Sequence, residues 1–431
     1  MATTRAPFLS STYGAYYHSQ VPQEDAELTR IGPGTPAGEY LRRFWQPVCY
    51  ADELADVPVG LKILGEELVA FRDFSGRIGL VEAHCPHRGT SLEFGLVSER
   101  GIRCCYHGWL FDVDGTILET PGEPAGSTFK DRLCHGAYPV HEFQGIIFAY
   151  MGPPEEIPDF PILDTYERDG YRLMPGKRYD YPCNWLQILE NAMDPVHASF
   201  LHTIVAGTQF TDEFGVIPNL DFMETPAGAI SMGTRRVGDN VWVRTTECVL
   251  PNVQQIAPIW NDGKGPEEGL DGPMMTRWIV PRDDTSTMIL ELRHISDSEE
   301  REPAWWLDRD QMLPAQLPIS DNFRDQQLQP SDYEAQVSQR SIAVHGLEHL
   351  GATDRGVTMF RRQLRRGIRG VQAGEGPGSL GTDENGHVST FCIDTQVPLP
   401  PASNADEDTR QLRELGLRKA EEYISNPPHK S

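Results

Sequence analysis

Cys85-Pro-His-Arg-Gly89 and Cys104-Cys-Tyr-His-Gly-Trp109 are the two stretches of sequence that decide the fold. Each carries Cys and His close together, and the residues between the stretches are numerous enough for a β-hairpin. Two thiolates and two imidazoles form a complete ligand set for one centre, either zinc or a two-iron cluster in which His replaces Cys on one iron. Zinc motifs usually group ligands of one kind, whereas each loop here supplies both kinds. The pattern therefore favours the two-iron cluster over structural zinc.

The order of residues in these loops resembles the cluster motif of the Rieske non-haem iron oxygenases. The resemblance implies a Rieske [2Fe–2S] cluster with four ligands, Cys85, His87, Cys104 and His107. The family spacing of Cys-x2-His selects Cys104 and leaves Cys105 as a packed neighbour. Respiratory Rieske proteins carry another Cys three residues after the first His, where this chain has Thr90. The match is therefore to the oxygenase and ferredoxin branch.

Residues 184–202 contain a second metal-binding pattern, in which His197 and His202 lie five residues apart. The apolar residues before them follow helical spacing. On a regular α-helix, residues five apart point about 140° away from each other, so both can bind one metal ion only if the helix is distorted. Pro195 supplies a cause, because proline removes a backbone donor and crowds the preceding turn. We therefore expect a widened turn that brings both rings to one side.

Downstream of the cluster motif, this pattern resembles the mononuclear iron site of the same oxygenases, which use two His and one carboxylate. Residues 331–351 resemble the C-terminal iron segment of the phthalate-dioxygenase-like branch, where the ligand Asp lies sixteen residues before the Glu of Glu-His-Leu-Gly. Asp332 and Glu348 have that separation, so the resemblance implies Asp332 as the third ligand, with Glu334 as the alternative. His345 and His349 are interpreted as structural.

Asp194 is the candidate catalytic residue beside the iron. In a helix, residues three apart are neighbours, so its carboxylate can reach the ring nitrogen of His197 that does not bind metal. The resemblance adds a contact with the second cluster His, here His107, of a neighbouring subunit. It therefore implies a homotrimer or a dimer of trimers. The alternative is that Asp194 only braces the helix break at Pro195.

The rest of the sequence predicts an α+β protein in three parts. Residues 47–152 alternate short apolar strands with Gly and Asp turns, which is typical of an all-β domain, and the resemblance implies that this is the Rieske [2Fe–2S] domain. Residues 153–431 predict a catalytic mononuclear-iron domain, with an antiparallel β-sheet covered by helices and a C-terminal extension. Residues 1–46 are expected to pack on the catalytic domain. Helices are expected over 34–46 and 407–424.

Composition narrows the possible partners. The chain has 431 residues, and 38 basic against 63 acidic residues give a net charge of −25, which disfavours nucleic acid and anionic membrane surfaces. The sequence contains no run of about 18 apolar residues, so no membrane span is predicted. The N-terminal sequence lacks the features of a secretory signal, so the expected location is cytoplasmic. No glycine-rich dinucleotide motif follows a strand, so this chain is not expected to use NAD(P)H directly, and a separate reductase is implied.

The resemblance implies the terminal oxygenase component of a multicomponent system that uses O₂ and reductase-supplied electrons. A reductase with FMN and a plant-type [2Fe–2S] cluster is expected. The branch acts mainly on aromatic acids and aryl ethers, so we expect hydroxylation or O-demethylation of a carboxylate-bearing aromatic substrate. Arg235, Arg236 and Arg244 lie on predicted strands and are candidates to bind that carboxylate. Two alternatives remain open, namely a Rieske-type electron carrier without oxygenase turnover and a zinc-binding interaction protein.

Overall fold

The computed structural model describes residues 12–13, 24–258, 272–298, 304–311 and 316–429. The chain forms two compact units. The smaller unit comprises residues 31–160 and 280–283, and the larger unit comprises 1–30, 161–279 and 284–431. These boundaries differ from the predicted division into 1–46, 47–152 and 153–431, because residues 31–46 belong to the smaller unit. Most of residues 1–23 lie outside the described residues.

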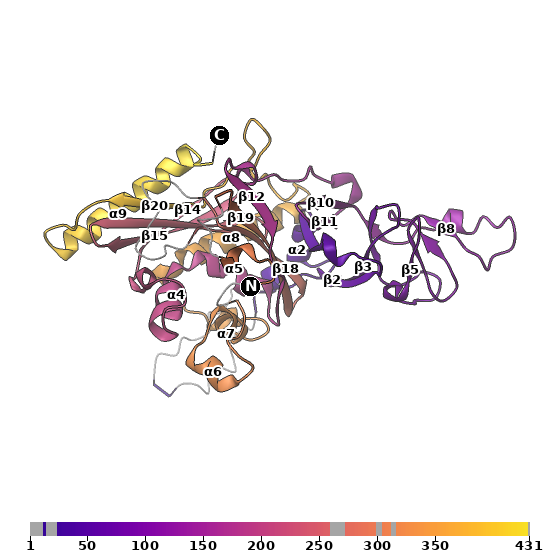
Figure 1. The fold of residues 1–431 in the computed structure, drawn as a ribbon, viewed down its shortest axis with the longest axis horizontal. Helices are drawn as coiled ribbons and strands as arrows, with labels where there is room; N and C mark the ends of the chain where they lie inside the picture. The colour runs from indigo at the N-terminus through magenta and orange to yellow at the C-terminus, as the bar shows by residue number, and fades with distance from the viewer. Residues whose placement is uncertain (1–11, 14–23, 259–271, 299–303, 312–315, 430–431) are drawn as a thin grey trace. The chain divides into compact units, whose positions relative to one another are not determined.

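Three antiparallel sheets build the smaller unit (Figure 1). The first contains β1 (Trp45–Tyr50), β11 (Ile146–Tyr150) and β10 (Val140–Phe143). The second contains β2 (Val59–Ile63), β3 (Glu66–Arg72), β4 (Ile78–Glu82) and β9 (Ala137–Tyr138). The third contains β5 (Leu96–Val97), β6 (Ile102–Arg103), β7 (Leu110–Phe111) and β8 (Ile117–Glu119). The prediction of an all-β domain around the Cys-His loops is confirmed.

One helix of the smaller unit shows where sequence boundaries fail. α2 (Pro36–Leu41) begins as expected, with the Thr35 side chain accepting a hydrogen bond from the Gly38 N–H at 3.3 Å. It ends earlier than predicted because the chain is already extended in β1 from Trp45. Apolar spacing alone does not mark this change, since the aromatic residues at its end also suit a strand.

A nine-stranded sheet forms the centre of the larger unit, in the order β12-β19-β18-β17-β16-β15-β14, with β13 paired to β19 and β20 to β16. Its strands are β12 (Tyr171–Pro175), β13 (Tyr179–Tyr181), β14 (Asn219–Glu224), β15 (Gly228–Val237), β16 (Asn240–Val249), β17 (Val253–Ile256), β18 (Met275–Asp283), β19 (Ser286–Ser296) and β20 (Asp394–Pro398). The sheet is antiparallel, as predicted, in the pairs β12–β19, β15–β16, β16–β20 and β17–β18.

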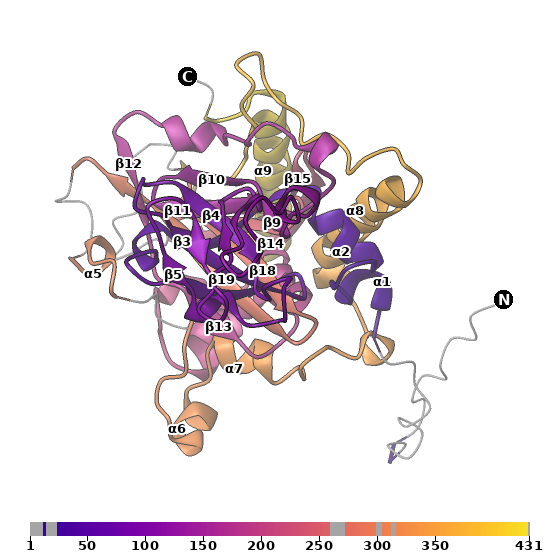
Figure 2. The ribbon, with the colours of Figure 1, turned by 90° about the vertical axis from the view of Figure 1, so that its right-hand side faces the viewer.

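Helices surround this sheet (Figure 2). They are α1 (Ala26–Thr29), α3 (Trp185–Leu189), α4 (Pro195–Ser199), α5 (Ala304–Leu307), α6 (Phe323–Leu328), α7 (Asp332–Val337), α8 (Arg355–Gln372) and α9 (Ala405–Ser425). α9 confirms the predicted C-terminal helix and packs Leu412, Leu415 and Tyr423 against the sheet. Among the described residues, no helix combines the length and the apolar composition that crossing a bilayer requires.

Alternation along β15 separates the two faces of this sheet. Ile230 and Met232 pack in the cluster that includes the α9 residues, so α9 covers the face to which these side chains point. The alternate positions Ser231, Gly233 and Arg235 lie on the other face and line a pocket. The register places Ser231 opposite Thr246 and Gly233 opposite Arg244 on β16. The pocket face is therefore defined by odd-numbered residues of β15 and even-numbered residues of β16.

Candidate metal centres

The two Cys-His loops have matching backbones. The Cys85 N–H donates to the Thr90 carbonyl at 2.9 Å, and the Cys104 N–H donates to the Trp109 carbonyl at 2.8 Å. In each loop, a glycine four residues after the Cys has φ near +75° and donates its N–H back to that Cys. A side chain would be strained at that backbone angle. Cys104, and not Cys105, is therefore the structural counterpart of Cys85.

The side chains of these loops suit a metal cluster. Cys85 and Cys104 are buried within one hydrophobic core and Cys105 is exposed. The His87 and His107 ring centroids lie 4.5 Å apart, and Trp109 stacks on His87 at 4.8 Å. Burial raises the pKa of the Cys85 thiol to about 11, and the adjacent Cys104 adds to this effect. Two buried thiols at close range ionise together only when a metal compensates their charge, so the donor set fits a [2Fe–2S] cluster.

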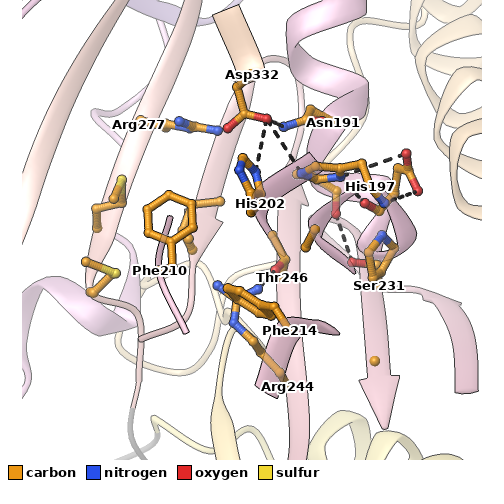
Figure 3. A pocket seen from close by; sticks show the side chains of 18 of the residues that line it. Asn191, His197, His202, Phe210, Phe214, Ser231, Arg244, Thr246, Arg277 and Asp332 are labelled. Atoms are coloured by element: carbon orange, nitrogen blue, oxygen red, sulfur yellow. Dashed lines mark hydrogen bonds and ion pairs between the residues drawn. The ribbon is translucent and has the colours of Figure 1, made fainter. Parts of the chain in front are cut away.

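Three side chains converge in the larger unit (Figure 3). Asp332 Oδ1 lies 3.6 Å from His197 Nε2 and 3.4 Å from His202 Nε2. The potential ligand atoms of the three residues all lie within 4.8 Å of one another. Two imidazoles and one carboxylate that converge in this way form the donor set of a non-haem Fe(II) site.

A π-helical segment allows two His five residues apart to meet. His197 belongs to α4, and His202 lies in the following segment η8 (Phe200–Val205), which is a π-helix. The wider turn of a π-helix, with hydrogen bonds between residues five apart, stacks such positions above one another. The predicted widened turn is confirmed, but its expected cause is wrong. Pro195 occupies the first position of α4, where proline fits a helix, and the widening begins only at Phe200.

Hydrogen bonds orient both imidazoles toward Asp332. His202 Nδ1 lies 2.7 Å from Gln209 Oε1, and His197 Nδ1 contacts the backbone carbonyl of Asp194. Each Nδ1 therefore donates a proton and leaves Nε2 free as a ligand. Burial lowers the pKa of His197. Burial also lowers the pKa of His202, but the charge and hydrogen bond of Asp332, together with the hydrogen bond to Gln209, outweigh this effect and raise the pKa.

Asp332 opens α7 and is 5% exposed. Burial raises the pKa of its carboxyl, but the neighbouring His202 and His197 outweigh this effect and hold the pKa well below its ordinary value. Glu334, the alternative ligand, instead accepts a hydrogen bond from the Ser331 N–H at 2.8 Å and caps α7. His345 Nδ1 accepts from the Asp25 N–H at 3.2 Å. These contacts give Glu334 and His345 structural roles outside the ligand set.

Asp194 has two distinct carboxylate oxygens. Its Oδ1 caps α4, accepting from the N–H groups of Val196 at 3.1 Å and His197 at 3.4 Å. Its Oδ2 lies 3.8 Å from His197 Nδ1, beyond hydrogen-bond distance. The expected bond between carboxylate and imidazole is therefore replaced by the bond to the Asp194 carbonyl, because the break between η7 (Glu190–Met193) and α4 changes the local geometry.

The triad opens into a pocket with a mainly apolar wall. Phe210, Phe214, Ile256, Met274 and Met275 supply that wall. Arg244 and Phe214 lie at the opposite end of the pocket from Asp332 (Figure 3). The guanidinium groups of Arg235 and Arg244 both lie against the Phe214 ring, at 5.3 and 5.5 Å from its centroid. The wall suits an organic substrate with an apolar body.

Only two of the three candidate arginines reach the pocket. Arg235 is buried, and its guanidinium donates to the Val216 and Pro195 carbonyls at 3.0 and 3.4 Å. Arg236 points to the opposite face of the sheet and pairs with Asp408 of α9 at 2.5 Å. Its assignment to the substrate was wrong because consecutive residues of a strand point to opposite faces. Strand alternation can be predicted from the sequence, and it means that Arg235 and Arg236 cannot both point into the pocket.

The polar residues that support the triad could not be identified from the sequence. Asn191, Gln209 and Gln316 each donate to or accept from a member of the triad. Asn191 lies within the segment 184–202 that carries the His pattern, but its position there indicates no role. Gln209 and Gln316 lie in irregular segments with no motif, and only the fold brings them to the site.

Comparisons with known proteins agree with this arrangement. Residues 44–139 match the family model of the Rieske [2Fe-2S] domain, and residues 181–304 match that of the vanillate O-demethylase oxygenase C-terminal domain. The chain is 40% identical to the oxygenase subunit of tert-butanol monooxygenase / tert-amyl alcohol desaturase from Aquincola tertiaricarbonis, covering 94% of this chain and 91% of that protein. It is 36% identical to the alpha subunit of phenoxybenzoate dioxygenase from Ectopseudomonas oleovorans, covering 88% and 93%.

Solved structures share the fold at lower identity. NdmA with caffeine, from Pseudomonas putida CBB5, is 20% identical with a TM-score of 0.60, over 80% of this chain and 95% of that one. Dicamba monooxygenase bound to dicamba is 19% identical with a TM-score of 0.58, over 78% and 99%.

Proposed function

The chain belongs to the Rieske non-haem iron oxygenases as a terminal oxygenase component, and we propose that it hydroxylates or O-demethylates an aromatic substrate that carries a carboxylate. We assign the [2Fe–2S] cluster to Cys85, His87, Cys104 and His107, and the mononuclear iron to His197, His202 and Asp332. When bound, these groups supply electrons and activate O₂. The protein's own contribution is to bind the substrate, exclude water and fix the ligands.

Arg244 is the observation that carries the choice of substrate. It donates to the Ala257 carbonyl at 2.8 Å, the Thr246 hydroxyl at 3.2 Å and the Pro258 carbonyl at 3.3 Å. Among the described residues, no carboxylate forms an ion pair with it within 4.0 Å. Burial lowers its pKa, and the charge of Asp394 only partly opposes this. A substrate carboxylate at this end of the pocket would stabilise the guanidinium and direct the ring toward the triad.

The system needs a reductase and O₂. We propose a reductase with FMN and a plant-type [2Fe–2S] cluster, and a homotrimer or dimer of trimers, on the basis of the family resemblance. In that assembly Asp194 would connect its own iron site with His107 of the neighbouring subunit. Among the described residues, the Oδ2 of Asp194 accepts none of the backbone hydrogen bonds that cap α4, and its side chain is 34% exposed, which supports this role.

A tertiary alcohol is the second candidate substrate. The 40% identity to the oxygenase that is named for tert-butanol and tert-amyl alcohol favours it, and so does the apolar wall of the pocket. Such a substrate has no charge, so it would not depend on Arg244. The two candidates therefore differ in a measurable way.

A substrate screen with a surrogate reductase tests the proposal. Aromatic acids, their neutral amides, aryl ethers and tertiary alcohols are each supplied with O₂, and products are identified by mass. We expect O₂ consumption coupled to oxygenated product for aromatic acids, with amides much poorer. Turnover confined to tertiary alcohols would refute the aromatic acid. O₂ consumption without product for all classes would contradict the assigned pocket.

A further inference from the structure

The two carboxylate oxygens of Asp332 lie in different surroundings. Oδ1 faces His197 and His202 and accepts from Asn191 Nδ2 at 3.2 Å. Oδ2 accepts from Gln316 Nε2 at 2.9 Å. Figure 3 shows Asn191 and Arg277 on opposite sides of Asp332. One oxygen is therefore directed to the metal position and the other is held by an amide.

The direction of the Gln316 amide is set by its second contact. Arg277 Nη1 donates to Gln316 Oε1 at 3.0 Å, and the Tyr181 hydroxyl donates to the Gln316 backbone carbonyl at 2.9 Å, which holds the residue in place. An amide has one acceptor end and one donor end, so an oxygen that accepts from the Arg277 guanidinium turns the NH₂ toward Asp332. If the amide were reversed, its oxygen would face the Asp332 carboxylate and its NH₂ would face the Arg277 guanidinium. An acceptor would then meet an acceptor, and a donor would meet a donor. Arg277 therefore fixes which group Gln316 presents.

Arg277 is itself fixed by the scaffold beneath the iron segment. Its Nε donates to Gln254 Oε1 at 2.5 Å, and Gln254 Nε2 donates to the Leu189 carbonyl at 2.8 Å. Leu189 is the last residue of α3, which leads directly into the segment with Asn191. The chain of contacts is buried, with Arg277 and Gln316 each 6% exposed. Among the described residues, no carboxylate lies within ion-pair distance of Arg277, and its charge helps to lower the pKa of Asp332.

We infer that Gln316 and Arg277 are positioning residues that make Asp332 a ligand through Oδ1 alone. Gln316 occupies Oδ2 and stops the carboxylate from rotating, and Arg277 keeps the Gln316 amide in the only productive direction. Buried partners that orient a metal ligand typically change metal affinity by about 10- to 100-fold when they are removed. This inference rests on the proposed role of Asp332 as an iron ligand.

Fe(II) affinity of the mononuclear site tests the relay, measured by competition with a chelator on protein that retains its [2Fe–2S] cluster. Gln316→Leu is expected to weaken Fe(II) binding by about 10- to 100-fold. Gln316→Glu should weaken it as much, because it has the same shape but lacks the N–H donor. Arg277→Met should weaken binding too, and Arg277→Met combined with Gln316→Leu should weaken it by less than the two single effects multiplied together, since Arg277 acts largely through Gln316.

Gln363→Leu is the matched control. Gln363 is a buried glutamine on α8 whose Nε2 donates to the Gly228 carbonyl at 2.7 Å, away from the triad. It should keep wild-type Fe(II) affinity, and its bound Co(II) should keep the wild-type visible spectrum. The Co(II) spectrum of Gln316→Leu should change, because the arrangement of ligands changes. Cluster absorbance and melting temperature confirm that each variant is folded.

Asp332→Ala separates failure of the relay from failure of the site. If Asp332→Ala loses Fe(II) while Gln316→Leu and Gln316→Glu bind it like wild type, the relay is refuted and the ligand stands. If Asp332→Ala itself binds Fe(II) like wild type, the proposed iron site is wrong. Full additivity of Arg277→Met and Gln316→Leu would show that the two residues act independently, which also refutes the relay.

Discussion

At the level of single residues, Cys104 and Cys105 provide a sharp test because they are adjacent and differ in burial. Cys104→Ser should abolish the EPR signal of the reduced [2Fe–2S] cluster, because a hydroxyl is a poor ligand for this iron. Cys105→Ser should keep the signal, since Cys105 is exposed and lies outside the hydrophobic core that contains Cys85 and Cys104. The reverse pattern would overturn the assignment and the backbone match between the loops.

Arg244 gives the second prediction at this level. Arg244→Gln removes a charged donor from the pocket, and a hydrogen bond to a charged group is worth about 1.5–3 kcal/mol. KM for an aromatic acid should therefore rise by about 10- to 100-fold, while KM for the matching amide changes little. Arg236→Gln is the control on the same sheet, because its side chain pairs with Asp408 on the far face. Equal effects of Arg244→Gln on acid and amide would mean that Arg244 is structural.

Motifs show how far single residues can be interpreted from sequence. The positions of His197, His202 and Asp332 were available because their spacing matches a pattern, and the structure brings all three together. Gln316 and Arg277 were not available, because Gln316 lies in an irregular segment that meets β18 and Asp332 only through the fold and not through local spacing. Residues that only support a ligand carry no spacing constraint, so sequence cannot identify them.

At the level of elements, strands and long helices were predictable and their junctions were not. The alternation that defines β15 and the amphipathic pattern of α9 are local properties of sequence. The π-helix η8 was expected from the demand of two His on one metal, yet its position depends on packing beyond Pro195. Helix ends also depend on the next element, as α2 shows where β1 follows it.

The helix α8 gives a prediction for stability. Arg361 pairs with Glu190 at 2.5 Å and Glu348 at 2.6 Å, and all three side chains are largely buried. Arg361→Leu should cost about 3–5 kcal/mol of unfolding free energy, because it leaves buried carboxylates without a partner. Arg362→Leu should cost no more than about 1 kcal/mol, since Arg362 is 66% exposed beside Glu224. Chemical denaturation of both variants compares them, and equal costs would contradict the argument.

At the level of the whole molecule, Asp194 tests whether electrons cross between subunits. Asp194→Asn should preserve the fold, because an Asn oxygen can still cap α4 through the N–H groups of Val196 and His197. His197 should keep its orientation, since its Nδ1 bonds the backbone carbonyl of residue 194 and not the carboxylate. The variant therefore changes mainly the charge at Oδ2.

Cluster content and iron content should stay near wild type in this variant, and the reductase should still reduce the cluster. Turnover should nevertheless fall by orders of magnitude if the carboxylate links His197 to His107 of the neighbouring subunit. Reoxidation of the reduced cluster in a single turnover, with substrate and O₂, isolates that step from reductase binding. Reoxidation at the wild-type rate would leave Asp194 as a helix cap alone, because the substitution retains the capping oxygen and removes only the charge.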